Sequence, residues 1–162
     1  MKKEKVFGNL STGETTKLYS IQNKNGMTLY VTNYGATVTK LIVPTNEGIT
    51  DVVLGFDRVE DYEKSYELPS APYFGTIVGR VAGRIANANF TLKGEKYEVT
   101  QNYGKHHLHG GKNGFGQKLW EVKHWEVNLI TLHYQSSHLE EGYPGNLDVL
   151  VTYEILENNT WK

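Results

Sequence analysis

The sequence predicts an all-β protein. Tyrosine (11 residues), tryptophan (3) and glycine (17) are abundant among its 162 residues, and runs of aromatic and β-branched side chains are broken by clusters of Gly and Asn. Aromatic and β-branched side chains favour strands, whereas Gly and Asn mark turns. Alanine-rich segments with a helical period are missing. We therefore expect short strands joined by tight turns.

Period-two alternation of apolar and polar residues locates the expected strands. They are residues 28–31, 37–43, 51–54, 119–127, 129–135 and 148–156, with a turn at 33–35. Residues 90–92 and 97–99 flank Lys93-Gly94-Glu95 and predict a hairpin. Residues 58–64 are the single segment expected to form a helical turn.

The last predicted strand, residues 148–156, is apolar on both faces. Val149, Val151 and Tyr153 alternate with Leu150, so the strand is expected inside a sandwich. A turn follows, and then residues 160–162 resemble the start of another strand. A strand left without its neighbour is an unprotected edge, so we expect a truncated domain. A frayed tail after a finished sheet is the alternative.

Composition and charge exclude several classes of function. The net charge is −1 and the basic residues are scattered, which gives no support for binding nucleic acid or an anionic membrane. The absence of cysteine excludes disulfides, thiolate nucleophiles and Cys-ligated zinc. No apolar run reaches membrane-spanning length, and the N-terminus does not resemble a signal peptide. The sequence thus predicts one domain with a cytoplasmic location.

A glycine-rich segment, residues 72–87, carries two arginines. Gly75, Gly79 and Gly83 recur every four residues, which indicates backbone that turns sharply or approaches another group closely. Arg80 and Arg84 each present a planar fork that can hold two adjacent oxygens of a carboxylate, a phosphate or a pair of sugar hydroxyls. For either arginine, pairing with a nearby loop carboxylate is the simpler alternative.

A second glycine-rich segment, residues 106–116, contains three histidines. His106, His107 and His109 fit no standard zinc spacing, and the HExxH motif is absent, so no metal site is predicted. A phosphate-binding loop is also unsupported, since the Walker pattern is missing. The remaining interpretation is a constrained loop that presents one histidine for acid–base chemistry or hydroxyl binding. A structural hydrogen bond is the alternative for each histidine.

A third segment places Glu140 and Glu141 beside a Pro-Gly turn. Two carboxylates could form a general acid/base pair. Adjacent residues usually diverge, however, so a rigid turn between strands is the favoured interpretation.

Taken in order along the chain, five motifs resemble the aldose 1-epimerase family. They are NYGA at 33–36, DVVLGFD at 51–57, the glycine-arginine segment at 73–85, LHGG at 108–111 with Gly114-Phe115 and Trp120, and EGYPGNL at 141–147. The resemblance implies an antiparallel β-supersandwich curved around a sugar cleft. It also implies interconversion of the α and β anomers of hexoses, chiefly galactose and glucose. The family uses acid–base ring opening and closure with no metal or organic cofactor, and the resemblance leaves the oligomeric state open.

Carried over residue by residue, the resemblance gives three substrate-binding positions. The family's sugar-binding arginine falls on Arg84 and its signature histidine on His109. Gly83 stands where the family usually has asparagine, so a backbone contact to the sugar survives and an amide contact does not.

The family's main catalytic groups have no counterpart in this sequence. Its acid histidine, in a Thr-Asn-His-type segment, and its base glutamate lie beyond Lys162. Residues 1–162 are therefore expected to be the N-terminal portion of a single epimerase domain, with no catalytic residue of their own. His124, His133 and His138 match no catalytic motif.

Two further functions remain open at this level. A non-catalytic carbohydrate-binding β-module could keep Arg84 and His109. A hexose-phosphate epimerase would need extra cations aimed at a phosphate, and the LHGG motif fits the family of unphosphorylated sugars better.

Overall fold

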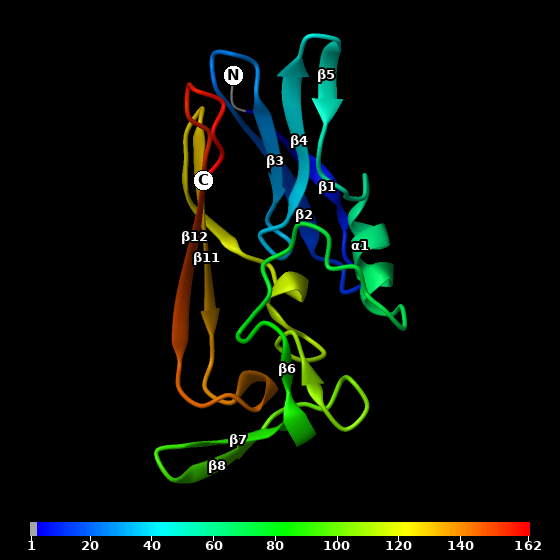
Figure 1. Cartoon of the computed structure of the whole chain (residues 1–162), viewed down its shortest axis with the longest axis vertical. Coiled ribbons are helices and arrows are strands. Elements are labelled where there is room, and N and C mark those ends of the chain that lie inside the picture. The colour runs from blue at the N-terminus through cyan, green and yellow to red at the C-terminus, as the bar shows by residue number, and fades with distance from the viewer. Residues whose placement is uncertain (1–2) are drawn as a thin grey trace.

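The computed structural model describes residues 3–162 as antiparallel strands with one α-helix (Figure 1). The first five strands form one sheet in chain order: β1 (Lys3–Asn9), β2 (Thr15–Gln22), β3 (Thr28–Thr32), β4 (Val38–Thr45) and β5 (Gly48–Asp51). A three-stranded sheet contains β10 (Glu121–Trp125), β11 (Leu129–Ser136) and β12 (Leu147–Glu154). The prediction of an all-β antiparallel fold is confirmed.

Two small strand pairs lie between these sheets in the sequence and at one end of the molecule in Figure 1. One pairs β6 (Arg84–Ile85) with β9 (His107–Leu108), and the other is the hairpin of β7 (Asn89–Leu92) and β8 (Glu95–Glu98). The predicted hairpin is therefore confirmed. Its turn has two residues, Lys93 and Gly94, whose positive φ angles of 53° and 88° suit a tight turn between antiparallel strands.

The main core lies between the two larger sheets. Alternate residues of β2, β3 and β4 point inward and meet apolar residues from β11, β12 and the segment before β10. Its fully buried members include Leu29, Val31, Ile130 and Leu132. This facing arrangement lets each sheet bury the apolar side that its period-two pattern provides.

Hydrogen bonds tie the two sheets together across this core. The Tyr153 hydroxyl donates to the Ala36 carbonyl at 2.8 Å, and the Trp125 indole donates to the Ser20 carbonyl at 3.3 Å. The polar ends of these aromatic side chains are thereby satisfied within an apolar layer.

The helix α1 (Val59–Tyr66) packs beside β1 (Figure 1). It confirms the helical turn expected at 58–64 and is slightly longer. Val59 and Tyr62 are buried against Phe7 and Leu18 in a second apolar cluster. Acidic residues in its first turn and Lys64 in its last turn interact favourably with the helix dipole.

The strand predictions for the first sheet need correction. The strand expected at 51–54 is wrong, because β5 ends at Asp51. There the Asp51 carboxylate accepts hydrogen bonds from the backbone N–H groups of Leu41 and Val53, at 3.1 and 3.2 Å, and turns the chain out of the sheet. Two strands of this sheet are not expected from the sequence: β1, whose exposed, charged residues give only a weak strand pattern, and β2.

The expectation for the last strand is also partly wrong. β12 forms in full register with β11, but within residues 3–162 it lies at the edge of its sheet. Tyr153 is buried, whereas Leu150 on the opposite face is 65% exposed. β12 therefore carries apolar side chains on both faces, but only one face is buried. Trp161 forms an antiparallel bridge with Ile155, and Lys162 exchanges two backbone hydrogen bonds of 3.0 Å with Glu154, the last residue of β12. The chain beyond the turn therefore does begin to pair with the end of β12, as expected.

No helix in residues 3–162 is long and apolar enough to cross a bilayer.

Candidate functional site

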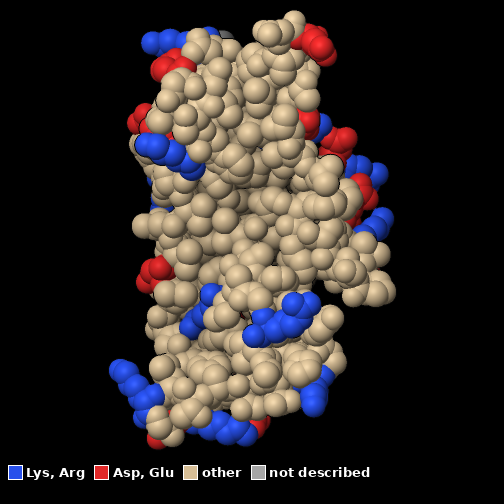
Figure 2. Space-filling view, in the orientation of Figure 1, with Lys and Arg blue, Asp and Glu red and all other residues tan. Residues whose placement is uncertain are grey.

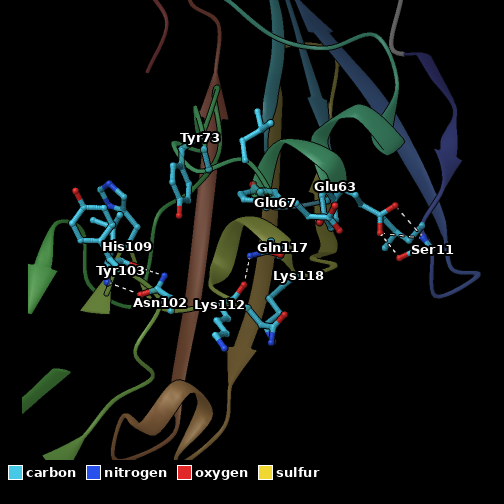
Figure 3. Close-up of a pocket in the computed structure, with 18 of the residues that line it drawn as sticks. Ser11, Glu63, Glu67, Tyr73, Asn102, Tyr103, His109, Lys112, Gln117 and Lys118 are labelled. Atoms are coloured by element: carbon cyan, nitrogen blue, oxygen red, sulfur yellow. Dashed lines mark hydrogen bonds between the residues drawn. The ribbon is translucent and has the colours of Figure 1, made fainter. Parts of the chain in front are cut away.

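An open cleft of about 1050 Å³ lies between α1 and the loops around β6 and β9 (Figure 3). One wall carries Arg84, Tyr103 and His109, and another carries Glu63 of α1 and Glu67, which caps the C-terminus of that helix. In Figure 2, Lys and Arg side chains lie on the face of the lower half of the molecule, near β6. The cleft is thus lined by polar groups that can donate and accept hydrogen bonds.

Backbone pairing of β6 with β9 brings two of the predicted sugar-binding residues together. Arg84 pairs with Leu108, so His109 lies next to Gly83 across the ladder. The His109 N–H donates to the Gly83 carbonyl at 3.0 Å. Arg84 and His109 are separated by 25 positions in sequence and still line the same cleft.

The ring of His109 has a defined tautomer. The Gly83 N–H donates to Nδ1 of His109 at 3.1 Å. A backbone N–H can only donate, so Nδ1 is the unprotonated nitrogen and the neutral ring carries its hydrogen on Nε2. Among residues 3–162 no hydrogen-bond partner is recorded for Nε2. His109 therefore offers the cleft one N–H donor.

Partial burial lowers the pKa of His109 below its ordinary value, and the positive charge of Arg84 lowers that pKa further. Both effects disfavour the imidazolium. The neutral tautomer with its Nε2 hydrogen is consequently the form present near pH 7.

Aromatic rings support both groups from the side. The Tyr73 ring meets the His109 ring edge-on, with centroids 4.9 Å apart. The Arg84 guanidinium carbon lies 4.9 Å from the centre of the Tyr103 ring. In the described chain no ion pair or hydrogen bond is recorded for the Arg84 guanidinium, which leaves its donors available to a ligand.

The third predicted residue, Gly83, contributes through its backbone. Its N–H and carbonyl hold His109 on both sides, as described above. Its φ is +84°, and a side chain at this position would point into open space. The position thus orients His109 and places no side chain of its own in the cleft.

Two glycine segments cross at close range behind this wall. A Cβ atom on Gly110 would lie 1.6 Å from the Gly79 carbonyl oxygen. Any other residue at 110 would force the two backbones apart, so this glycine is required by the approach of the segments. The crossing fixes the loop that carries His109 against the segment that carries Arg84.

Glu141 fixes the other end of the His109 loop. Its carboxylate accepts hydrogen bonds from the backbone N–H groups of Lys112 and Asn113, each at 3.0 Å. Glu140 has different partners: Lys118, at 2.9 Å, and the hydroxyls of Tyr134 and Ser136. The two carboxylates diverge, which confirms the interpretation of this segment as a rigid turn.

Arg80, in contrast to Arg84, has an entirely internal role. Its Nε donates to the Ser136 hydroxyl at 2.8 Å. Its two terminal nitrogens donate to the backbone carbonyls of Ser136, Ser137, Pro144 and Gly145, at 2.7–3.1 Å. All five N–H donors of the guanidinium are used, so none remains for a ligand.

The neighbouring histidines also have structural roles. His107 is fully buried, with Nδ1 2.6 Å from the Thr100 carbonyl and Nε2 2.7 Å from the Tyr143 hydroxyl. His106 accepts a hydrogen bond from the Asn87 N–H. No group of three potential metal ligands occurs in residues 3–162.

Three further histidines lie outside the cleft. His124 and His133 pair with Glu126 and Asp148 at 2.9 Å, and His138 accepts a hydrogen bond from the Gly145 N–H at 2.8 Å. None of the three lines the cavity.

Several lining residues were not predicted from the sequence. They are Ser11, Glu63, Glu67, Tyr73, Asn102, Tyr103, Lys112, Gln117 and Lys118 (Figure 3). Most lie in loops without a periodic pattern. Tyr73 and Lys112 lie within the two glycine-rich segments, 72–87 and 106–116, but their place in the cleft depends on contacts that no sequence pattern reveals.

The family model for aldose 1-epimerase matches residues 17–162 of this chain. The chain is 37% identical to the aldose 1-epimerase of Haemophilus influenzae over 98% of its own length and 45% of the relative. It is 41% identical to the galactose mutarotase of Bos taurus over 93% of its own length and 42% of the relative. The chain thus spans less than half the length of these relatives.

Solved structures give the same result. The GalM/aldose epimerase homologue from C. elegans superposes with a TM-score of 0.78 at 37% identity, covering 85% of this chain and 41% of that one. The galactose 1-epimerase from Lactobacillus acidophilus superposes with a TM-score of 0.79 at 25% identity, covering 98% and 46%. These matches confirm the galactose mutarotase-like fold. In sequence and in fold, the chain belongs to the aldose 1-epimerase family.

Proposed function

We propose that the protein interconverts the α and β anomers of hexoses such as galactose and glucose, as a cytoplasmic enzyme of hexose metabolism. Arg84 and His109 bind the sugar, and the Gly83 backbone orients His109. Residues 1–162 supply this binding wall as the N-terminal portion of one domain. The main acid and base lie outside the chain.

One observation carries this proposal: a neutral His109 and an Arg84 whose guanidinium has no ion pair or hydrogen bond within residues 3–162 line the same wall of one cleft. A hexose presents vicinal hydroxyls and a ring oxygen, all of which accept hydrogen bonds. The planar fork of Arg84 can span two adjacent oxygens, and the Nε2 hydrogen of His109 can donate to a third. Neither group needs a metal or an organic cofactor for this role.

A non-catalytic carbohydrate-binding module is the second candidate. The lining of the cleft favours this module. Among the described residues, Arg84 and His109 are the only arginine and histidine that line it, and both can bind a sugar by hydrogen bonds. Binding without catalysis requires no more than these groups supply.

Polarimetry with freshly dissolved α-galactose tests the enzyme proposal on the intact protein. We expect mutarotation well above the buffer rate, strongly reduced in Arg84→Ala and in His109→Ala. Arg80→Ala, assayed on its folded fraction, serves as the control. Saturable galactose binding with no rate enhancement would instead support the binding module.

The same test can be applied to residues 1–162 alone. We expect no rate above buffer, because the proposed acid and base are absent. A robust rate that disappears in His109→Ala would place the chemistry in this half. The coding sequence after the Lys162 codon discriminates independently, since a Thr-Asn-His-type segment supports the enzyme and a stop codon supports the module.

A further inference from the structure

We propose that Tyr103 is a positioning residue that holds the Arg84 guanidinium in the orientation required to grip the sugar. The inference rests on the proposed function and adds a residue that no motif in the sequence singles out. Tyr103 lies on the loop between β8 and β9 and lines the same cleft as Arg84 (Figure 3).

The contact between the two side chains is the first observation. The Arg84 guanidinium carbon lies 4.9 Å from the Tyr103 ring centre, within the range of a cation–π interaction. In residues 3–162 this is the single partner recorded for that guanidinium. An exposed arginine with no anchor samples many rotamers, and fixing them on ligand binding lowers affinity. Stacking on a ring restricts those rotamers before the sugar arrives.

The backbone of Tyr103 is itself held firmly. Its N–H and carbonyl both bond with His106, at 3.1 and 3.0 Å, which closes a tight turn. Asn102, the preceding residue, clamps Leu108 with two side-chain hydrogen bonds of 2.7 and 2.9 Å. Leu108 pairs with Arg84 in the β6–β9 ladder. The ring of Tyr103 is thus placed beside Arg84 by the pairing that also forms the cleft wall.

Core packing does not account for the position of this ring. Tyr103 is 45% exposed and belongs to none of the apolar clusters among the described residues. Its hydroxyl has no recorded partner in residues 3–162. An exposed aromatic ring on a constrained turn is more readily explained by its contact with Arg84 than by a contribution to stability.

Nitrogen-15 relaxation of the Arg84 Nε–H in the intact protein, without sugar, tests the positioning directly. We expect an ordered Nε–H in the wild type and in Tyr103→Phe, which keeps the ring. Tyr103→Leu should make this group mobile and remove the ring-current shift of its resonance. Tyr97→Leu is the matched control, because Tyr97 stacks on Phe90 in the β7–β8 hairpin and does not line the cleft. Unchanged order in Tyr103→Leu would overturn the proposal.

Galactose titration then tests the consequence. Tyr103→Leu should weaken binding about 3- to 10-fold, the range of an exposed to partly desolvated cation–π contact, whereas Tyr103→Phe and Tyr97→Leu should bind like the wild type. In an Arg84→Ala background Tyr103→Leu should have no further effect. An equal loss in both backgrounds would mean that Tyr103 contacts the sugar itself and would refute a positioning role. If the wild type binds no galactose, the proposed function fails, while the relaxation measurement still decides whether Tyr103 positions Arg84.

Discussion

The two sides of the β6–β9 region use the same residue types for opposite purposes. On the inner side, Arg80 and His107 have every polar nitrogen bonded to the protein. On the cleft side, Arg84 and His109 lie within four residues of them, and within residues 3–162 each has donors without an internal hydrogen bond. Residue type and local spacing therefore do not separate a structural group from a binding group here. The number of internal partners does, and each prediction below tests that distinction.

The largest effect is expected from Arg80→Ala. Four backbone carbonyls and the Ser136 hydroxyl would lose a charged donor, some of them in partly buried positions. Hydrogen bonds to charged groups contribute about 1.5–3 kcal/mol each and are not additive, so we expect a loss of about 3–5 kcal/mol in the free energy of unfolding. Denaturant titration measures it. Arg84→Ala is the matched control and should change that free energy by less than about 0.5 kcal/mol. Similar losses of stability in the two variants would show that Arg80 and Arg84 do not differ in structural role.

His107→Phe should destabilise the fold by about 2–4 kcal/mol, because the Thr100 carbonyl and the Tyr143 hydroxyl would be left buried without their partner. His109→Phe is the control on the cleft side, where we expect a smaller loss of stability. Thermal or denaturant unfolding of both variants decides the matter. A larger loss for His109→Phe would show that the cleft histidine has the structural role.

Arg84→Ala should weaken galactose binding by about 2–4 kcal/mol if its fork grips ring hydroxyls in a desolvated site. Such a contact acts on ground state and transition state alike, so KM should rise more than kcat falls. Arg84→Lys should restore only part of the affinity, since an ammonium lacks the planar fork.

Steady-state rates and galactose titration of these variants measure both effects. Arg80→Ala, studied on folded protein, should bind like the wild type. Normal binding by Arg84→Ala together with weak binding by Arg80→Ala would reverse the assignment of the two arginines.

The smallest effect concerns pH. The pKa of His109 is lowered, chiefly by burial and then by Arg84, so galactose affinity should be constant from neutral pH down to the ordinary histidine pKa of about 6.5. Below the depressed pKa, protonation places a hydrogen on Nδ1 that opposes the Gly83 N–H. Affinity should then fall, by up to about tenfold per pH unit if the imidazolium cannot bind.

The same protonation affects stability with a definite sign. A histidine with a lowered folded-state pKa binds protons more readily when unfolded, so its contribution is present above about pH 6.5 and is lost as pH falls through the folded-state pKa. An NMR titration of the His109 ring gives this pKa directly. In Arg84→Ala it should rise but stay below the ordinary value, because burial is the larger cause. If the His109 pKa did not change in Arg84→Ala, the charge of Arg84 would have no effect on the His109 ring.

The sequence predicts the sheets better than it predicts the site. Strands such as β11 bury alternate side chains, and that period is visible in the residues themselves. The pairing of Arg84 with Leu108 depends on two strands of two residues each, which are too short to show any period. The resemblance to the family named Arg84 and His109, whereas the contacts that distinguish them from Arg80 and His107 required the structure.

Tyr103 and Glu141 illustrate the same limit. Tyr103 lies 19 positions from Arg84, and Glu141 lies 29 positions from Lys112, whose N–H it binds. Such partners come from loop conformations that tertiary packing selects. Leu150 shows the converse error, because an apolar residue in a strand predicts burial that the edge of a sheet does not provide.

The crossing of Gly79 and Gly110 has a consequence for protein engineering. Because the two backbones touch, neither loop can be exchanged alone without moving the other. A transplant of this sugar-binding wall into another β-sandwich must therefore carry residues 79–84 and 107–116 together. It must also carry Glu141, whose carboxylate closes the second loop. The unit that a designer can transfer is a set of three distant segments, and a single motif such as LHGG grafted alone would not keep its shape.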